Sequence, residues 1–552
     1  MHALGALASH DALCGGAAIP VSVRYIPDLK RVYVEPATGS NGLGACATLT
    51  QIWENLPQLN SPLYAINTTT SAVSEVPTGT WLLTEDLYIE DGITLSVVGA
   101  GGGGDADELR LMSNSETFLN LRGNGGSLVF QNTRVWSWDE AMDGPDEDIS
   151  DGRSYISCLS EIVTDESLLC AGRAEHTVGE CRMDIHNSEM AYLGYDAPEA
   201  WGISSIVRGF CSDKSNPEIF DSVGVHGTIY ASDLHHNYHG YYTLGNLAGD
   251  WKGNTVHDNI QDGFHAREYS RRLMIAGNDV YDNGNHGIVG SEWSSDLTIF
   301  ENIVYGNRIG IFLHRMGDRA VVQLNYVNVC SEAGIALLES SHGIISGNVL
   351  LQSLVNLRVS VGSNDNIFEN NVIRRGKKYE ISVYEGSSRS DLPVYRDSGR
   401  PGNNIFCKNK FEGPRHDDGG VHIANADGTQ FVENLIFDGP WHFNIENSQS
   451  FVFSGNHGYE RVDVSLDSES CVDPVSDFGE AVCEDSHAVL YQPSDLSLHG
   501  KLAVVDMYLD TFDSAGSTSS NPPSSSSTEL LADNAKLTST APAAAAAAVV
   551  AV

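Results

Sequence analysis

The sequence predicts an all-β protein built as a parallel β-helix, a solenoid of about 22–25 residues per coil. An Asn marker recurs at steps of 24, 24, 23, 23 and 23 residues, and a Gly marker runs in step with it. Between the markers lie short runs of Val, Ile, Leu and Phe bounded by Asn, Asp and Gly, which are strand and turn signals without a helical period. The asparagines are Asn254, Asn278, Asn302, Asn325, Asn348 and Asn371, and the glycines are Gly240, Gly263, Gly287, Gly310 and Gly334.

The Asn column has a physical reason at a tight bend between two strands. We expect each Asn to adopt a left-handed backbone there and to satisfy backbone groups that the bend leaves unpaired. Its side-chain amide can also hydrogen-bond to the Asn of the coils above and below. These residues are therefore interpreted as scaffold, and none is a candidate for the functional site.

The chain divides into four predicted segments. Residues 1–75 give no clear structural signal, and residues 76–465 form the β-helix, with an insertion rich in Gly, Ser and Pro at 377–403. Residues 466–513 are expected to close the coil as a C-terminal cap. A Ser/Pro-rich linker and an Ala-rich low-complexity tail follow at 514–552.

Composition limits the partners and the compartment. The net charge of −41 excludes a general nucleic-acid or anionic-membrane surface, and no segment is long and apolar enough to span a membrane. Ten cysteines, with local clusters at Cys158, Cys170, Cys181 and Cys211 and at Cys471 and Cys483, favour disulfides and a secreted or cell-wall protein. The triplet beginning at Asn67 is compatible with glycosylation, although the N-terminus lacks the pattern of a signal peptide.

Aligning the coils on the shared Gly produces columns of residues. Tyr242 should stack on His265 in the next coil, because coils lie about 4.8 Å apart. Arg267, two residues after His265, should point the same way. His314 should lie two coils beyond Arg267, about 10 Å away. We therefore expect one outward patch that contains Tyr, His, Arg, Glu and a second His.

Such a patch suits the removal of a proton next to a carboxylate. That reaction needs a base, a cation on the carboxylate and an acid that returns a proton. His can act as the base near neutral pH, Arg pairs with a carboxylate through two parallel hydrogen bonds, and Tyr can donate the returning proton. A long β-helix face would fit a linear polymer. By contrast, no clustered Asp set marks a pectin-type lyase or a galacturonan hydrolase.

Five stretches together resemble the mannuronan C5-epimerases of alginate synthesis, over roughly residues 80–460. The resemblance implies a right-handed β-helix and conversion of β-D-mannuronate to α-L-guluronate by removal and return of the C5 proton. The stretches are AYLGYD at 191–196, ASDLHHNYHGYYTLG at 231–245, VHDNIQDGFHAREYSRRLMIAGNDVYDNGNHGI at 256–288, GIFLHR at 310–315 and GIALLESS at 334–341.

The reacting residues of that family are altered here. The family motif Asp-Pro-His-Asp, whose His is taken as the base, reads His265-Ala266-Arg267-Glu268, and a family Tyr just before the motif's Gly is Asp262. The family's Ser-Arg becomes Ser291-Glu292, and its Leu-Asp-Arg becomes Leu313-His314-Arg315. Either catalysis has been lost and a glycan-binding face retained, or the roles have moved. In the second case, His265 or His314 is the base, Arg267 or Arg315 holds the carboxylate, and Tyr242 returns the proton.

The sequence therefore favours a mannuronan C5-epimerase-like isomerase that acts on an anionic alginate chain. A polyuronate lyase and a non-catalytic binding protein of the cell wall remain as alternatives. We expect a monomer without an organic cofactor or a metal centre; calcium could bind product or loops, but the sequence places no site for it. The predicted catalytic residues are His265, Arg267, Glu268, His314 and Tyr242, and the predicted substrate-binding residues are Arg315, Tyr269, His286 and Glu292.

Overall fold

The computed structural model describes most of the chain as far as residue 490. The described residues are 21–37, 45–161, 179–209, 223–315, 317–386, 399–413, 420–437, 441–458, 461–472 and 486–490. Several sequence predictions concern residues outside these ranges. They are the pairing of Cys170, Cys211 and Cys483, most of the C-terminal cap, and the linker and tail at 514–552.

Three long sheets, here named sheets A, B and C, contain the strands of the described residues. Sheet A contains β1 (Val21–Ile26), β2 (Arg31–Pro36), β7 (Asp86–Glu90), β10 (Asn120–Asn124), β14 (Tyr155–Glu161), β17 (Gly202–Arg208), β20 (His239–Leu244), β23 (Phe264–Arg267), β26 (His286–Ser291), β29 (Ile309–His314), β32 (Ala333–Leu338), β35 (Val355–Ser360), β38 (Tyr379–Tyr384), β41 (Gly420–Ala424), β44 (Trp441–Glu446), β46 (Val462–Leu466) and β47 (Ser486–Leu490). Sheet B contains β3 (Ala45–Thr48), β8 (Ile93–Val98), β11 (Ser127–Gln131), β15 (Arg182–His186), β18 (His226–Tyr230), β21 (Asp250–Lys252), β24 (Met274–Ala276), β27 (Thr298–Phe300), β30 (Val321–Gln323), β33 (Ile344–Ser346), β36 (Ile367–Glu369), β39 (Ile405–Cys407), β42 (Gln430–Val432) and β45 (Val452–Ser454). Sheet C contains β4 (Leu63–Asn67), β5 (Ala72–Ser74), β6 (Thr80–Leu83), β9 (Glu108–Met112), β12 (Arg134–Asp139), β13 (Gly144–Pro145), β16 (Glu189–Ala191), β19 (Asp233–His235), β22 (Thr255–His257), β25 (Asp279–Tyr281), β28 (Ile303–Tyr305), β31 (Tyr326–Asn328), β34 (Val349–Leu351), β37 (Val372–Arg374), β40 (Lys410–Glu412) and β43 (Leu435–Phe437).

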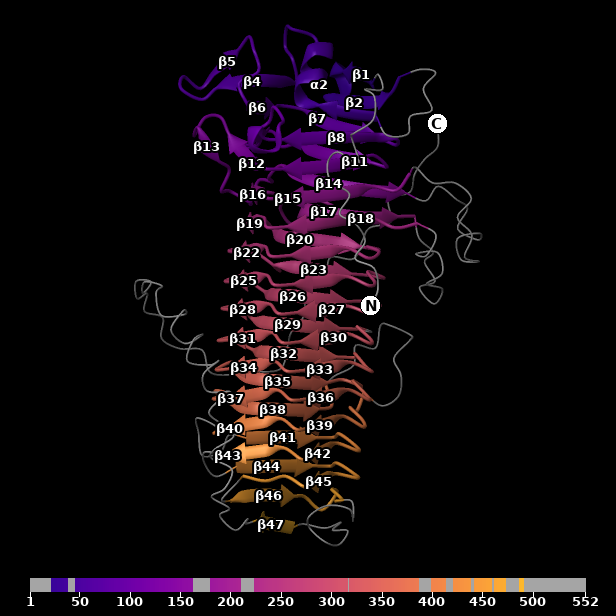
Figure 1. The fold of residues 1–552 in the computed structure, drawn as a ribbon, viewed down its shortest axis with the longest axis vertical. Coiled ribbons are helices and arrows are strands. Elements are labelled where there is room, and N and C mark those ends of the chain that lie inside the picture. Colours follow the sequence, from indigo (N-terminus) through magenta and orange to yellow (C-terminus); the bar gives the residue numbers. More distant parts are fainter. Residues whose placement is uncertain are drawn as a thin grey trace. The chain divides into compact units, whose positions relative to one another are not determined.

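One coil contributes one strand to each sheet in turn, as β20, β21 and β22 do. Each strand pairs in parallel with the equivalent strand of the next coil, so β20 pairs with β23 and β23 with β26. Figure 1 shows these strands one above another along the stack. The architecture is the parallel β-helix that the marker spacing predicts, and it places equivalent residues of successive coils side by side.

The three sheets enclose a continuous apolar core. In the short strands a buried residue stands between two partly exposed ones, as Val256 does in β22. Aromatic side chains also stack along the core, with Phe368 and Phe406 4.6 Å apart between ring centroids, and Phe406 and Phe431 4.7 Å apart. A residue flanked by two core residues of a sheet A strand therefore faces outward.

The Asn column forms a buried ladder. The amide nitrogen of Asn302 donates to Oδ1 of Asn325 at 2.9 Å and to the carbonyl of Ile275 at 2.9 Å, and the pattern repeats along the stack. The predicted backbone position is wrong by one residue, because the left-handed residue precedes the Asn, as Glu301 (φ 53°) and Leu324 (φ 56°) do. The preceding residue turns the chain, and the Asn can then aim its amide into the stack.

The N-terminal residues are more ordered than their sequence indicates. β1 and β2 form an antiparallel pair, and β3 already belongs to sheet B. The helix α2 (Leu49–Asn55) buries Leu49 and Ile52 against this end of the core. Thr48 and Gln51 form a reciprocal capping box at its start, so a local helix signal was present in the sequence. Among the described residues, the other helical segments are two short 3-10 turns at Pro27–Leu29 and Ala100–Gly102.

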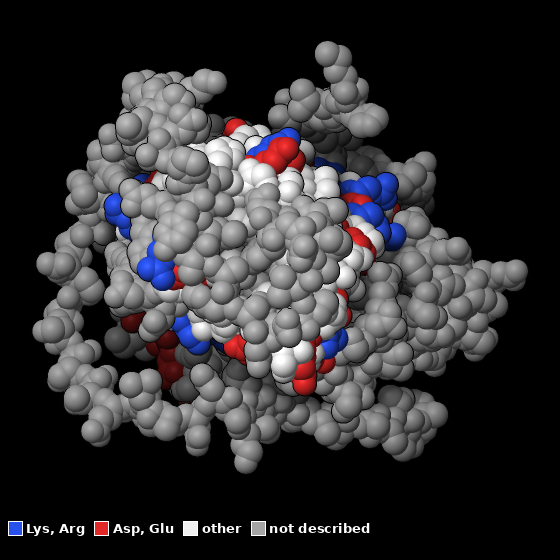
Figure 2. Space-filling model, turned by 90° about the horizontal axis from the view of Figure 1, so that it is seen from below, with Lys and Arg blue, Asp and Glu red and all other residues white. Residues whose placement is uncertain are grey.

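Other boundaries also differ from the sequence interpretation. The predicted insertion at 377–403 contains β38, a regular strand of sheet A that pairs with both neighbours. At the far end, β46 continues sheet A, and β47 pairs with it antiparallel. No helix of the described residues is long and apolar enough to cross a membrane. Seen along the stack from below, charges of both signs lie next to one another on the visible surface (Figure 2), so neither sign forms a continuous patch there.

Candidate functional site

The candidate site lies on the outward face of sheet A, where β20 and β23 run side by side. Tyr242 is level with His265, and their rings meet edge to face with centroids 5.2 Å apart. Within β23, Phe264 and Ala266 are buried in the core, so His265 and Arg267 point outward together. The guanidinium of Arg267 donates to the hydroxyl of Tyr242 at 3.2 Å. The column alignment of the sequence therefore places these three side chains correctly.

A carboxylate links the two arginines of the predicted site. Oε1 of Glu292 accepts a hydrogen bond from Arg267 at 3.1 Å and another from Arg315 at 3.2 Å. The carboxylate of Glu268, which is largely buried, lies 3.8 Å from the Arg267 guanidinium. Both cations that could bind a substrate carboxylate are thus in contact with an acidic side chain of the protein.

The centre of the polar cluster is Asp262, in the turn before β23, which the sequence reasoning noted but did not assign to the site. Its Oδ1 accepts hydrogen bonds at 2.8 Å from Nδ1 of His286 and at 3.1 Å from the backbone N–H of His286. Its Oδ2 lies 2.8 Å from Nδ1 of His265 and 3.4 Å from Nδ1 of His239. His239 is likewise absent from the predicted site. The sequence did contain a signal for Asp262 and His239. They are 23 residues apart, which is one coil, so they lie side by side on neighbouring coils.

Burial and neighbouring charges set the ionisation of these groups. Burial alone would raise the pKa of Asp262, but His265 and His286 hold that pKa well below its usual range, so the carboxylate is ionised. Burial lowers the pKa of His239 to about 3. Burial also raises the pKa of Tyr242 to about 12, against the opposing effect of Arg267. Burial would lower the pKa of Arg267, but Tyr242 and Glu292 raise it, so the guanidinium stays charged.

The remaining predicted residues take separate positions. His314 is level with Ser291, whose hydroxyl lies 2.9 Å from Nε2 of His265. Burial and Arg315 lower the pKa of His314 to about 3, and its ring stacks on Phe312, with centroids 4.9 Å apart. Tyr269 is almost fully buried, stacks on Trp293 and belongs to an apolar cluster that also contains Tyr242.

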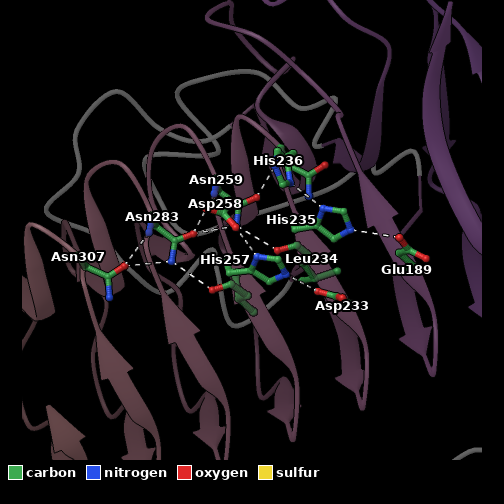
Figure 3. A network of polar contacts seen from close by, with 12 residues as sticks. Glu189, Asp233, Leu234, His235, His236, His257, Asp258, Asn259, Asn283 and Asn307 are labelled. Carbon is green, nitrogen blue, oxygen red and sulfur yellow. Dashed lines mark hydrogen bonds and ion pairs between the residues drawn. The ribbon is translucent and has the colours of Figure 1, made fainter. Parts of the chain in front are cut away.

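A second group of histidines lies on sheet C, on another face of the coil. The rings of His235 and His257 stack with centroids 5.1 Å apart, and Nδ1 of His235 lies 2.8 Å from Nδ1 of His236. Figure 3 shows these rings with the carboxylates of Glu189, Asp233 and Asp258. The stack continues through Tyr281 and Tyr305. These rings form a ladder along the stack of coils.

The family model described as a right handed beta helix region matches residues 212–350. The crystal structure of the periplasmic alginate epimerase AlgG has a TM-score of 0.58 to this chain at 18% identity, and the match covers 75% of this chain and 95% of that chain. This chain is a right-handed parallel β-helix. The fold and its handedness are thereby confirmed. At this level of identity the likeness extends to the fold alone.

Two further structures share less with this β-helix. The A-module of the Azotobacter vinelandii mannuronan C-5 epimerase AlgE6 is 14% identical, with a TM-score of 0.35 and coverage of 71% of this chain and 91% of that chain. An alginate lyase from Paenibacillus sp. str. FPU-7 is 12% identical, with a TM-score of 0.30 and coverage of 57% and 98%. No curated protein matches the sequence.

Proposed function

We propose that this β-helix modifies an anionic polyuronate by removing the C5 proton of a uronate residue, and that it converts β-D-mannuronate to α-L-guluronate in alginate. The observation that carries the proposal is the gathering of Tyr242, His265 and Arg267 on two adjacent coils. These are the three chemical functions that proton transfer next to a carboxylate requires. The alginate epimerase AlgG, which shares this fold, supports the choice of substrate class.

His265 is assigned as the base. The ionised carboxylate of Asp262, 2.8 Å from Nδ1, stabilises the imidazolium that forms when Nε2 takes the C5 proton. Nε2 meets the hydroxyl of Ser291 on the outward side of the strand, which is where a substrate would approach. His314 is the poorer base, because burial and Arg315 lower its pKa to about 3.

Arg267 and Tyr242 complete the reaction. Arg267 pairs with the substrate carboxylate and stabilises the enolate-like charge that develops after C5 loses its proton. The hydroxyl of Tyr242 accepts a hydrogen bond from Arg267, so its own proton points elsewhere and can be donated to C5. Exchange with solvent then restores the proton of Tyr242 and neutralises His265. Glu292 must release Arg267 before this guanidinium can bind substrate.

A polyuronate lyase is the second candidate, and one contact favours it. Tyr242 and His265 touch each other in this structure, so they must separate before a sugar ring can lie between them. Inversion at C5 needs the returning proton to arrive from the opposite side. Elimination needs the acid only at the leaving 4-linked oxygen and can use two groups on one side.

A non-catalytic, polysaccharide-binding protein is the third candidate, because Glu292 neutralises both arginines. For all three we propose a secreted or cell-wall location. The disulfide between Cys158 and Cys181 supports it, as do the disulfide-bonded Cys46 and Cys471, because disulfides persist in oxidising compartments.

The test is incubation of the purified full chain with polymannuronate. Proton NMR reports guluronate, and ultraviolet absorbance reports the unsaturated ends that a lyase leaves. We expect guluronate from the wild type and none from His265→Gln or Arg267→Ala. His422→Gln changes an outward histidine further along sheet A and should leave the rate unchanged. Unsaturated ends would identify a lyase, and binding without either product would identify the non-catalytic protein.

A further inference from the structure

Three side chains on two neighbouring coils bring their ligand atoms together at the edge of the candidate site. His239 begins β20, Asp262 lies in the turn before β23, and His265 lies within β23. One atom from each, a ring nitrogen or a carboxylate oxygen, lies within 4.8 Å of the other two. Asp262 and His239 are buried, and the side chain of His265 is 16% exposed. Among the described residues, no other group of three His, Cys, Asp or Glu side chains converges in this way.

The contacts within this group centre on the carboxylate of Asp262. Nδ1 of His265 is buried and lies 2.8 Å from Oδ2 of Asp262. Nδ1 of His239, 3.4 Å from the same oxygen, accepts a hydrogen bond from the backbone N–H of Asp262 at 3.3 Å. That nitrogen is therefore the unprotonated nitrogen of the ring. Two ring nitrogens therefore lie within 3.4 Å of one carboxylate oxygen. A cation among these atoms would be held by all three side chains.

The spacing fits a small transition cation. Imidazole nitrogens and carboxylate oxygens bind zinc at about 2.1 Å, so two ligands at a tetrahedral angle lie roughly 3.4 Å apart. The observed separations are 2.8 and 3.4 Å. Calcium and magnesium prefer sites made of oxygen atoms, whereas imidazole suits zinc and its neighbours in the first transition row.

His286 supports the carboxylate from outside the group. Its ring Nδ1 and its backbone N–H both donate to Oδ1 of Asp262, at 2.8 and 3.1 Å. The other oxygen, Oδ2, is thereby held toward His239 and His265. Hydrogen bonds of this kind orient the ligands of metal sites and strengthen metal binding.

We propose that His239, Asp262 and His265 bind a divalent transition cation such as zinc, with His286 orienting the carboxylate. A further consequence rests on the proposed function, although the binding does not. A neutral imidazole that binds a cation through Nδ1 carries its proton on Nε2 and cannot accept one from C5. The cation-loaded protein is therefore inactive, and the cation and the substrate proton compete for the same imidazole.

The test uses the full chain, freed of metal with a chelator and titrated with ZnCl2 by calorimetry. We expect one equivalent to bind to the wild type, at least tenfold weaker binding by His239→Ala, and a smaller loss for His286→Gln. CaCl2 and MgCl2 should produce no binding that His239→Ala removes. His257→Gln is the matched control, because His257 also lies between two carboxylates, at 3.1 and 2.7 Å, outside the proposed site.

Circular dichroism of each variant confirms that it folds, and the visible spectrum of bound Co²⁺ reports nitrogen ligation independently of affinity. Equal zinc binding by the wild type and His239→Ala, or no saturable binding by the wild type, would overturn the proposal. The calorimetry does not depend on turnover, so a protein that makes no guluronate can still bind zinc. Conversely, an active protein that zinc neither binds nor inhibits would retain the proposed function and lose only this inference.

Discussion

Arg267 donates a hydrogen bond to Glu292 at 3.1 Å across two neighbouring coils on the outward face of sheet A. The same carboxylate oxygen accepts from Arg315 at 3.2 Å. Glu292 therefore accepts hydrogen bonds from both guanidinium groups that would otherwise bind a uronate carboxylate. Any anionic sugar that binds here must compete with a carboxylate that belongs to the protein.

We predict that Glu292→Gln binds oligomannuronate more tightly than the wild type. The neutral amide competes less well for Arg267 and Arg315, and a hydrogen bond to a charged group contributes about 1.5 kcal/mol, so the gain should be roughly tenfold. Calorimetric titration with a mannuronate oligomer measures it. Glu301→Gln is the control, because Glu301 is exposed in the bend between β27 and β28. It also has a similar left-handed backbone, with φ 53° against 51° at Glu292. An unchanged or weaker affinity would show that Glu292 does not compete with the substrate.

The Asn ladder should carry much of the stability of the middle coils. Asn371 donates to Oδ1 of Asn409 at 3.0 Å and to the carbonyl of Ile345 at 2.9 Å, and its own Oδ1 accepts two bonds from Asn348. Asn371→Ala leaves buried donors and acceptors unpaired, and we expect a loss of about 3 kcal/mol in the free energy of unfolding. The neighbouring Asn370 is exposed and left-handed (φ 55°), so Asn370→Gly should be nearly neutral. Urea denaturation compares the two variants, and equal losses would contradict a special role for the ladder.

Features that repeat could be predicted from the sequence, because a fixed period converts sequence position into spatial position. The period placed Tyr242 against His265 and Arg267 beside it, and it predicted the buried Asn ladder. It did not locate the left-handed residue, because either residue of a two-residue bend could turn the chain.

Features outside the columns were harder to predict. Asp262 lies in a turn, where the alignment assigns no direction to a side chain, so its three histidine contacts were not foreseen. Helix α2 is too short for its periodicity to stand out, and only its capping box marks it. The bridge of Glu292 between two arginines depends on side-chain reach across coils, which spacing along the sequence does not specify.

The disulfide between Cys158 and Cys181 joins the middle of β14 in sheet A to the residue just before β15 in sheet B. The two cysteines are 23 residues apart, and closing a loop of this length restricts the unfolded chain by about 3 kcal/mol. We expect the double variant Cys158→Ala/Cys181→Ala to lose a similar amount of unfolding free energy in urea. Dithiothreitol should destabilise the wild type more than the double variant, since one of its targets is already absent. An equal effect of the reductant on both would show that this bridge adds nothing.

Glu380 should make the stability depend on pH. It lies fully buried in β38, where Oε1 accepts a hydrogen bond from the backbone N–H of Gly376 at 2.7 Å and Oε2 accepts one from Asn356 at 2.5 Å. Burial raises the pKa of Glu380 to about 8 in spite of these two bonds, against an ordinary value of 4.5. Between these two values the folded protein holds a proton that the unfolded chain releases. The stabilisation that protonated Glu380 adds to the folded protein is therefore complete below pH 4.5 and is lost as the pH rises toward 8. The free energy of unfolding falls by at most about 5 kcal/mol over this range.

Glu380→Gln removes this titration, because the amide is neutral at every pH. We expect the stability of the wild type to fall relative to Glu380→Gln between pH 5 and pH 8.5, whatever the offset between the two proteins at pH 5. Urea denaturation at both values measures the change. Glu433→Gln, at an exposed turn before β43, should keep the pH dependence of the wild type. Parallel curves for the wild type and Glu380→Gln would mean that Glu380 stays ionised in the folded protein, with its charge satisfied by the two hydrogen bonds.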